Sequence, residues 1–363
     1  MTEAQPGWCT NVLATGSMAD LVDTLTHLSD GLPPGTPVGL WLPDAILTDD
    51  PQLAVAPLAA CLEDLGTPLL GLNAFPINDF HQARVKDAVY QPAWDEPARL
   101  KATLRAAEAM VALSAPESDL CLTTVPIGWP AHDVHISRAI ELLHQACKAL
   151  EQLGHSHDRT MALAIEPEPG CIIPTARALA DFVANTPLED AVACGSLRVC
   201  LDACHLAVEH EDPNDAVTIM QETGIRIGRV QVSSAPEADT PAGIAAIKAL
   251  DEARWMHQTS VMSGDERVMF NDLSETHHAH PTGVWRTHLH VPVHRTSFGE
   301  LKTTQSWIGR LLRAVAATGQ RPPVEVETYA WDVLPKSYRA ATLQEDIRCE
   351  LEWTHHIMQE VKW

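Results

Sequence analysis

A set of acidic residues and histidines in this sequence stands within or directly after short apolar runs. These residues are Glu166, Asp202, His205, His288, His290, Glu325 and Glu327. An ionised side chain at the end of a buried strand is costly unless it is paired, hydrogen-bonded or bound to a cation. Three carboxylates and one imidazole would together form a mixed oxygen and nitrogen cage for a divalent ion. The residue types and their positions therefore predict a metal or catalytic site.

Four of these residues, Glu166, Asp202, His290 and Glu327, are the predicted metal ligands. Carboxylate-rich ligation with one histidine suits Mn²⁺, Mg²⁺, Co²⁺ or Fe²⁺, and an open catalytic Zn²⁺ site also fits. Taken singly, an Asp or Glu at a strand end is more often a helix cap or a salt-bridge partner. Three further residues are candidates for binding the metal or the substrate: Gln231, His288 and Glu168.

The elements that would position these side chains alternate along the chain. Nine short apolar runs are candidate strands, and stretches of helical spacing separate most of them. The runs cover residues 7–13, 37–43, 69–75, 121–127, 161–167, 198–206, 229–235, 288–293 and 324–331. Repeated strand and helix units predict a parallel sheet, and about eight units predict a (β/α)₈ barrel, whose site lies at the C-terminal ends of the strands. An open doubly wound sheet is the alternative, but no glycine-rich phosphate loop supports it.

One segment does not follow this rhythm. Residues 236–286 are too long for a simple crossover and are interpreted as an insertion in the barrel that could serve as a lid. We expect residues 1–363 to form a single barrel domain and residues 337–363 to close the chain as a C-terminal helix.

Residues outside the proposed cage could contact a substrate. Asn73, His81 and Lys86 lie in the loop NAFPINDFHQARVKD, where exposure at the surface is the alternative. Trp331 could supply an apolar wall, as could Trp41 and Trp94, although core packing is the more common role for any one tryptophan. The tracts with His277, His278 and His280 and with His355 and His356 are interpreted as solvated residues.

The composition of the chain excludes some classes of binding partner. The formal net charge of −23 disfavours nucleic acid and anionic membrane surfaces. The first residues lack a basic and apolar leader, and nowhere do 18 apolar residues run together, so we expect a cytoplasmic protein without membrane insertion. Nine cysteines without a C-x-x-C pair are expected to be buried and reduced. The expected partner is a small molecule, and a homodimer is compatible with the sequence.

The order of these residues resembles a known family. A Glu at one strand end, Asp202-Ala203-Cys204-His205, His288-Leu289-His290 and then Glu327 are similar to the xylose isomerase-like barrels, which include sugar isomerases, ketose epimerases and inosose dehydratases. A more specific resemblance, to the EboE-type "metabolite traffic" proteins, covers nearly the whole chain. It rests on CTNV, NAFPINDFH, VKDAVYQPAW, TTVP, EPEPG, LDACHLAV, QVSSA, LDEARWMHQT, HLHVP and VEVETYAWDVLP.

The resemblance implies roles. It implies the same four metal ligands, an acid/base pair of Glu166 and Glu327, and a His205 that contacts the substrate or the ligand Asp. Gln231 stands where a family member often has its ligand His; we favour His290 because imidazole is the stronger ligand. The implied substrate is a sugar or cyclitol, phosphorylated or not, from a secondary-metabolite pathway.

Several reactions remain open at this point. Proton transfer next to a metal-bound carbonyl would make an isomerase or epimerase, whereas loss of a β-hydroxyl would make a dehydratase acting on an inosose-like cyclitol. A non-catalytic metabolite carrier is a further alternative. Metal-dependent phosphodiester hydrolases share the barrel and the ligands, but they gather more histidine ligands and a basic groove for DNA, and this chain is acidic.

Overall fold

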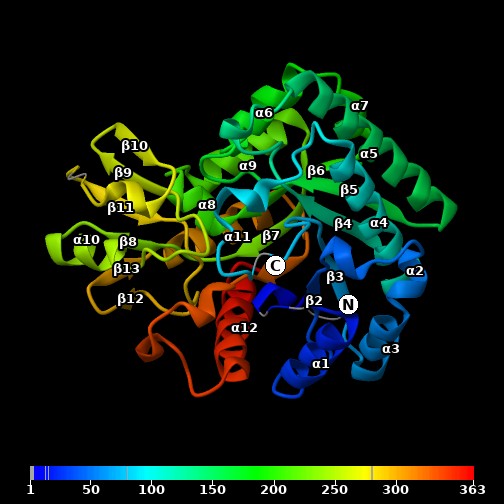
Figure 1. Cartoon of the computed structure of the whole chain (residues 1–363), viewed down its shortest axis with the longest axis horizontal. Coiled ribbons are helices and arrows are strands. Elements are labelled where there is room, and N and C mark those ends of the chain that lie inside the picture. The colour runs from blue at the N-terminus through cyan, green and yellow to red at the C-terminus, as the bar shows by residue number, and fades with distance from the viewer. Residues whose placement is uncertain (1–3, 13, 15, 80, 279–280) are drawn as a thin grey trace.

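The centre of the molecule is a closed barrel of parallel strands with helices around it (Figure 1). This computed structural model describes residues 4–12, 14, 16–79, 81–278 and 281–363. In barrel order the eight strands are β1 (Gly7–Cys9), β14 (Val324–Val326), β7 (Arg226–Val232), β6 (Leu197–Asp202), β5 (Thr160–Ile165), β4 (Asp119–Thr124), β3 (Leu69–Asn73) and β2 (Val38–Trp41). The predicted (β/α)₈ fold is confirmed, and the open doubly wound sheet is wrong.

The barrel helices follow from local signals in the sequence. They are α1 (Met18–Ser29), α2 (Pro51–Ala54), α3 (Ala56–Leu65), α4 (Pro97–Leu113), α5 (Ile136–Ser156), α6 (Ala176–Ala184), α7 (Glu189–Cys194), α8 (Ala203–Val208), α9 (Pro213–Thr223), α11 (Gln305–Ala317) and α12 (Leu343–Glu360). Thr175 caps α6 by accepting a hydrogen bond from the backbone N–H of Ala178. Strand β6 is buried along its whole length, as expected for a parallel strand covered on both faces.

The barrel interior is not wholly apolar. Arg229 of β7 and Glu325 of β14 are fully buried, with Nη1 of Arg229 lying 3.0 Å from Oε2 of Glu325. A methyl group on Gly39 would overlap the Glu325 carboxylate, and one on Gly71 would overlap the Arg229 guanidinium. The two glycines therefore leave the space that this buried ion pair occupies.

A second sheet lies beside the barrel and is seen in yellow and orange in Figure 1. Its antiparallel order is β10 (Glu266–Phe270), β9 (Thr259–Ser263), β11 (Val284–Thr287), β8 (Pro236–Ala238), β13 (Leu301–Thr303) and β12 (Ser297–Phe298). Helix α10 (Pro241–Lys248) contacts β8 and β13. The segment interpreted as an insertion thus contains strands of its own, and its sheet continues beyond residue 286 to Thr303.

The prediction that residues 288–293 form a barrel strand is wrong. This segment leaves β11 and contains no strand. The backbone N–H of His288 donates to the carbonyl of Gln258, whereas that of Val291 donates to the carbonyl of Ser234. These two partners lie in different segments, so no continuous ladder forms even though the alternating pattern is strand-like.

The structure also tests two further predictions, that the cysteines are buried and reduced and that no segment inserts into a membrane. All nine cysteines lie in the described part of the chain and are free thiols. Seven are buried, as predicted, but Cys194 is exposed and Cys349 is partly exposed, because both lie on outer helices. No helix among the described residues is long and apolar enough to cross a bilayer.

Candidate metal centre

Two of the predicted ligands stand at the ends of neighbouring barrel strands. Glu166 directly follows β5, and Asp202 is the last residue of β6. Asp202 also caps α8, because its Oδ1 accepts hydrogen bonds from the backbone N–H of His205 at 2.8 Å and from the hydroxyl of Ser233 at 2.7 Å. Its Oδ2 is buried and has no hydrogen-bond partner among the described residues. The helix cap therefore orients this carboxylate and leaves one oxygen for another partner.

Glu327 approaches from the other side of the barrel, directly after β14. Its Oε1 accepts hydrogen bonds from Nδ2 of Asn11 at 2.6 Å and from Nδ2 of Asn73 at 3.1 Å. Two amide donors on one oxygen stabilise the ionised carboxylate and hold its orientation. Its Oε2 lies 3.9 Å from Nδ1 of His290.

His290 is held in one tautomer. Its Nδ1 donates to the backbone carbonyl of Glu327 at 2.6 Å, because a carbonyl can only accept. Its Nε2 then carries a lone pair, which is buried without a partner in the described structure and lies 3.9 Å from Oδ2 of Asp202. This is the arrangement of a metal-binding histidine whose second nitrogen is fixed by a carbonyl.

The ligand atoms converge. Atoms of Glu166, Asp202 and Glu327 lie within 4.8 Å of one another, and so do atoms of Asp202, His205 and His290. All of these residues are buried. Leaving the facing atoms of Asp202 and His290 unpaired would cost roughly 1–3 kcal/mol for each group. A divalent cation would satisfy both, so the residues fit the metal that the sequence predicts.

The electrostatics of the cluster favour a cation. Burial raises the pKa of Glu166 well above its usual value, and the nearby Glu327 and Asp202 carboxylates raise it further. Burial followed by the charge of Asp202 raises the pKa of Glu327 in the same way. Burial lowers the pKa of His290 to about 4, so its imidazole is neutral and able to bind a metal at neutral pH.

A second layer of polar residues borders this cluster. Nδ1 of His205 lies 3.0 Å from the carbonyl oxygen of Pro167, and its Nε2 lies 3.1 Å from Nε2 of His288. The hydroxyl of Tyr90 donates to Oε1 of Glu168 at 2.7 Å. Ligand atoms of Glu168, His205 and His288 lie within 4.8 Å of one another. The structure thus brings these three sequence-predicted residues together beside the four proposed ligands.

A cavity of about 90 Å³ opens over the cluster. Its lining includes eight of the residues named from the sequence, which are Asn73, Lys86, Glu166, Glu168, His205, His288, His290 and Glu327. Asp202 is not among the lining residues. Phe75, Trp255 and Tyr329 form apolar parts of the wall.

Besides Asp202, the candidate residues Gln231, His81 and Trp331 lie outside this lining. Gln231 of β7 is fully buried, and its Oε1 accepts a hydrogen bond from the thiol of Cys200 at 3.3 Å. The His81 ring packs near Trp41 and Trp255, and Trp331 is buried in the turn after β14. Among the described residues, the aromatic side chains that line the cavity are Phe75, Tyr90, Trp255 and Tyr329, and Trp331 is not one of them.

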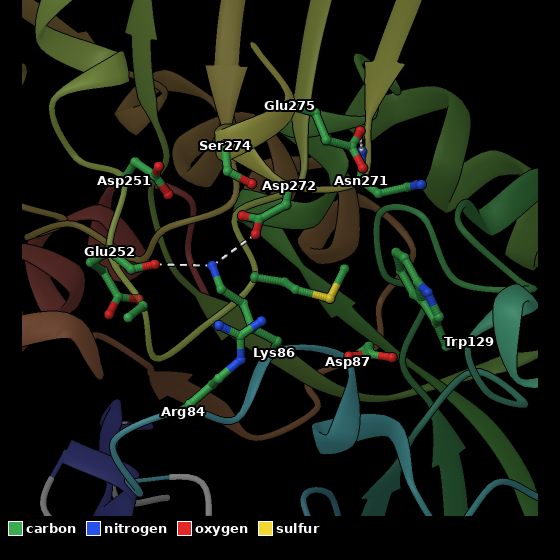
Figure 2. Close-up of a pocket in the computed structure, with 12 residues that line it drawn as sticks. Arg84, Lys86, Asp87, Trp129, Asp251, Glu252, Asn271, Asp272, Ser274 and Glu275 are labelled. Atoms are coloured by element: carbon green, nitrogen blue, oxygen red, sulfur yellow. Dashed lines mark hydrogen bonds and ion pairs between the residues drawn. The ribbon is translucent and has the colours of Figure 1, made fainter. Parts of the chain in front are cut away.

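Asn73 and Lys86 line the cavity but already have partners in the protein. Asn73 binds Glu327, as described above, and Nζ of Lys86 donates to Oδ2 of Asp272 at 2.7 Å and to the carbonyl of Glu252 at 2.9 Å. Figure 2 shows these two bonds of Lys86 in an outer groove of about 640 Å³, with Trp129 on the side opposite Glu252. Lys86 and Met256 line both the outer groove and the inner cavity.

Sequence reasoning missed four residues that shape the cluster: Asn11, Tyr90, Gln258 and Tyr329. Asn11 could have been found, because it lies in the C-terminal half of the first predicted strand, residues 7–13, near the end where the barrel rule places site residues. Tyr90 and Gln258 come from a loop and from the inserted segment, and no periodic pattern in the sequence predicts their approach.

Trp41 and Trp94, which were candidates for an apolar wall, pack in the core. The Nε1 groups of Trp41 and Trp94 donate to Pro76 and Thr124, and both rings are fully buried. The His277 ring lies 2.8 Å from Asp251. His356 is exposed, whereas His280 lies outside the described residues.

Comparisons with known proteins agree with this fold. No protein-family model and no curated protein matches the sequence. An L-ribulose 3-epimerase is similar in structure, with 13% identity, a TM-score of 0.55, and coverage of 99% of this chain and 96% of that chain. An IOLI protein with a bound zinc atom has 12% identity, a TM-score of 0.54 and 98% coverage of both chains.

A third similar structure is a fusion protein of a xylose isomerase-like TIM barrel and a 4-hydroxyphenylpyruvate dioxygenase. It is 14% identical with a TM-score of 0.54, and the match covers 99% of this chain but 43% of the fusion. At these identities the likeness shows the fold alone, a (β/α)₈ barrel.

Proposed function

We propose that this protein is a divalent-metal-dependent isomerase or epimerase that acts on a sugar or cyclitol by moving a proton next to a carbonyl group. One observation carries the proposal. Oδ2 of Asp202 and Nε2 of His290 are buried without a hydrogen-bond partner among the described residues, and they face the same space that Glu166 and Glu327 border. That set of atoms suits a divalent ion, and its two remaining carboxylates suit proton transfer.

The ion would be held by Glu166, Asp202, His290 and Glu327. When bound, it would polarise a substrate carbonyl and acidify the adjacent C–H. Glu166 and Glu327 would act as the acid/base pair: one carboxylate removes the proton and the other returns it on the opposite face. They extend from β5 and β14, which are separated in the barrel by β6 and β7, so they reach the substrate space from different sides. Asn11 and Asn73 would keep Glu327 ionised and oriented.

Several features support a small polyhydroxylated substrate. The cavity combines carboxylate and imidazole groups with the aromatic side chains of Phe75, Trp255 and Tyr329, which suits a sugar or cyclitol ring. One of the similar structures is a sugar epimerase. Lys86 is the single lysine or arginine among the described lining residues, and its ammonium group is already paired with Asp272. We therefore favour an unphosphorylated substrate. The narrower resemblance to EboE-type proteins would place it in a secondary-metabolite pathway.

Mn²⁺, Mg²⁺, Co²⁺, Fe²⁺ and Zn²⁺ are all compatible with three carboxylates and one imidazole. Metal analysis of the purified protein is the first test. Less than about a tenth of an equivalent of any divalent metal, with none bound on titration, would contradict a metal-dependent enzyme.

The reaction itself is tested by isotope exchange. The metal-loaded protein is incubated in D₂O with a panel of ketoses and inosose-like cyclitols, and products are analysed by NMR and mass spectrometry. We expect deuterium at the carbon next to the carbonyl, and loss of this exchange in Glu166→Gln and Glu327→Gln. Glu141→Gln, which changes an exposed carboxylate on α5, should exchange like the unmodified protein.

The outcomes separate the rival functions. Exchange accompanied by loss of a β-hydroxyl would make the protein a dehydratase. Tight binding of a panel member without exchange would make it a carrier. If no panel member binds and none exchanges, the result would contradict both the enzyme and the carrier hypotheses.

A further inference from the structure

His205 and His288 meet at the cavity through ring nitrogens that both carry lone pairs while the rings are neutral. Their Nε2 atoms are 3.1 Å apart. Nδ1 of His205 lies 3.0 Å from the carbonyl oxygen of Pro167. Because a carbonyl only accepts, Nδ1 of His205 carries the hydrogen, and its Nε2 carries a lone pair.

The tautomer of His288 follows from a chain of hydrogen bonds. The Tyr90 hydroxyl donates its single hydrogen to Glu168, so it accepts from Nε2 of Gln258. The amide oxygen of Gln258 is thereby directed at Nδ1 of His288, 2.9 Å away. Nδ1 of His288 must donate to this oxygen, which leaves a lone pair on its Nε2 as well.

Two lone pairs 3.1 Å apart repel each other unless a cation lies between them. The separation suits two ligands of one metal ion. Metal–nitrogen bonds of about 2.0–2.1 Å that meet at angles of roughly 90–109° place the two nitrogens about 2.9–3.4 Å apart. The observed distance falls within this interval.

Glu168 completes the set. Its Oε2 is buried and has no hydrogen-bond partner in the described part of the chain, while the Tyr90 bond fixes its other oxygen. One ligand atom each from Glu168, His205 and His288 lies within 4.8 Å of the other two. All three side chains line the cavity, so a fourth position on an ion would face the space proposed for the substrate.

The charge of the region also calls for a second cation. Four buried carboxylates gather around the cavity, Glu166, Glu168, Asp202 and Glu327. One divalent ion would balance only two of them. The nearby guanidinium of Arg229 is paired with Glu325 deeper in the barrel.

We propose that Glu168, His205 and His288 form a second metal site that takes Zn²⁺ or another divalent ion with a preference for imidazole. Two histidines and one glutamate with an open fourth position form a ligand set suited to catalytic zinc. This proposal extends the proposed function by adding a second ion at the same cavity, and it gives His205 a role as a ligand rather than a direct substrate contact.

Anomalous X-ray diffraction on crystals of the full chain soaked in Zn²⁺ tests the proposal without any substitution. We expect two peaks, one among Asp202, His290 and Glu327 and one between His205 and His288. A peak at the first position alone would overturn the second site and leave the proposed function standing. A peak at the second position alone would support the second site and contradict the metal site of the proposed function. No peak at either position would contradict both metal sites.

Metal stoichiometry of variants gives an independent check. The unmodified protein should bind two equivalents of Zn²⁺. His288→Ala should bind one, as should Glu327→Gln, with the loss confined in each case to a different site. His356→Ala removes an exposed histidine on α12 and should retain two equivalents. One equivalent in the unmodified protein, unchanged in His288→Ala, would show that the two rings share a proton instead of a metal ion.

Discussion

At the scale of single residues, the carboxylate of Glu327 illustrates how the protein prepares a ligand. One oxygen accepts hydrogen bonds from Asn11 and Asn73, and the other lies 3.9 Å from Nδ1 of His290. Neighbouring donors of this kind orient a metal-binding carboxylate and keep it ionised. The asparagines come from the ends of β1 and β3, so the fold itself holds the ligand.

Asn11→Ala should therefore weaken metal binding without abolishing it. The amide of Asn73 would still hold Glu327, so we expect an affinity loss of about 10–100-fold, typical of removing a group that supports a ligand. Titration with Mn²⁺ or Zn²⁺ followed by calorimetry measures the change. Asn185→Ala alters an exposed asparagine after α6 and should leave the affinity unchanged. Equal affinities for both variants would contradict a supporting role for Asn11.

At the scale of elements, a clasp joins the loop before α4 to the inserted segment over the cavity. The backbone N–H groups of Val85 and Lys86 donate to the carbonyl of Arg254 at 2.7 and 2.8 Å. The Lys86 side chain adds its ion pair with Asp272, in which both side chains are 14% exposed. The cavity beneath is about 90 Å³, whereas ligand sites usually measure about 300–1,000 Å³. The clasp must therefore loosen for a molecule as large as the proposed sugar substrate to enter.

Lys86→Met should make this clasp open more often. Loss of a mostly buried ion pair is expected to raise hydrogen exchange at the backbone amides of Val85, His257 and the substituted position itself about tenfold, which corresponds to about 1.4 kcal/mol. Exchange measured by mass spectrometry or NMR tests this. Lys302→Met breaks the exposed Lys302–Asp239 pair in the second sheet and should leave these amides unchanged. Identical exchange in both variants would show that the ion pair does not hold the clasp.

A buried carboxyl group on helix α12 is hydrogen-bonded to segments that carry proposed metal ligands. Oε1 of Glu350 accepts hydrogen bonds from the backbone N–H of Val293 and the hydroxyl of Thr328, close to His290 and Glu327. Burial raises the pKa of Glu350 to about 8. The folded protein therefore binds this proton more tightly than the unfolded chain. The resulting stabilisation is complete below about pH 4.5 and is lost as the pH rises to about 8.

Glu350→Gln should flatten this pH dependence, because glutamine resembles the neutral acid. In metal-saturated protein we expect the unmodified chain to lose stability on the order of a few kcal/mol between pH 5 and 8 relative to the variant. Thermal unfolding across this range measures the difference. Glu352→Gln, an exposed change on the same helix, should follow the unmodified profile. Parallel profiles for Glu350→Gln and the unmodified chain would show that Glu350 is ionised throughout.

At the scale of the whole molecule, the barrel is closed around a buried ion pair. Arg229 and Glu325 lie in its interior, and Nη2 of Arg229 also donates to the carbonyl of Cys121 at 3.0 Å. This ion pair and its hydrogen bond to Cys121 join β7, β14 and β4. Breaking the pair should therefore destabilise the barrel that positions the proposed metal ligands.

Arg229→Met should destabilise the barrel by about 3–5 kcal/mol, because it leaves the Glu325 carboxylate buried without a partner. Arg229→Met combined with Glu325→Met should recover much of this loss, since both charges are then removed together. Urea unfolding monitored by circular dichroism compares the two variants. A double variant no more stable than the single one would indicate that the loss arises from packing around Gly39 and Gly71 instead of the unpaired charge.

The sequence by itself determined the barrel and most of the candidate site. Strand and helix periodicity is a local property, so eight barrel strands were predictable, and the barrel rule then placed Glu166, Asp202 and Glu327 at one rim. Asn11 obeyed the same rule and was overlooked. The proposed roles of these residues remain predictions that the experiments above test.

Only the tertiary structure decided how the remaining groups meet. The segment with His288 and His290 has a strand-like pattern, yet its backbone hydrogen bonds go to two different partners, so it crosses the site instead of joining the barrel. Tyr90 and Gln258 are 168 residues apart and join only because the inserted segment folds back over the loop before α4. Contacts of this kind depend on long-range packing, which leaves no periodic signal in the chain. Hydrogen-bond geometry likewise decides which atoms are available to a metal, because Asp202 and His290 each have one atom fixed and one atom free.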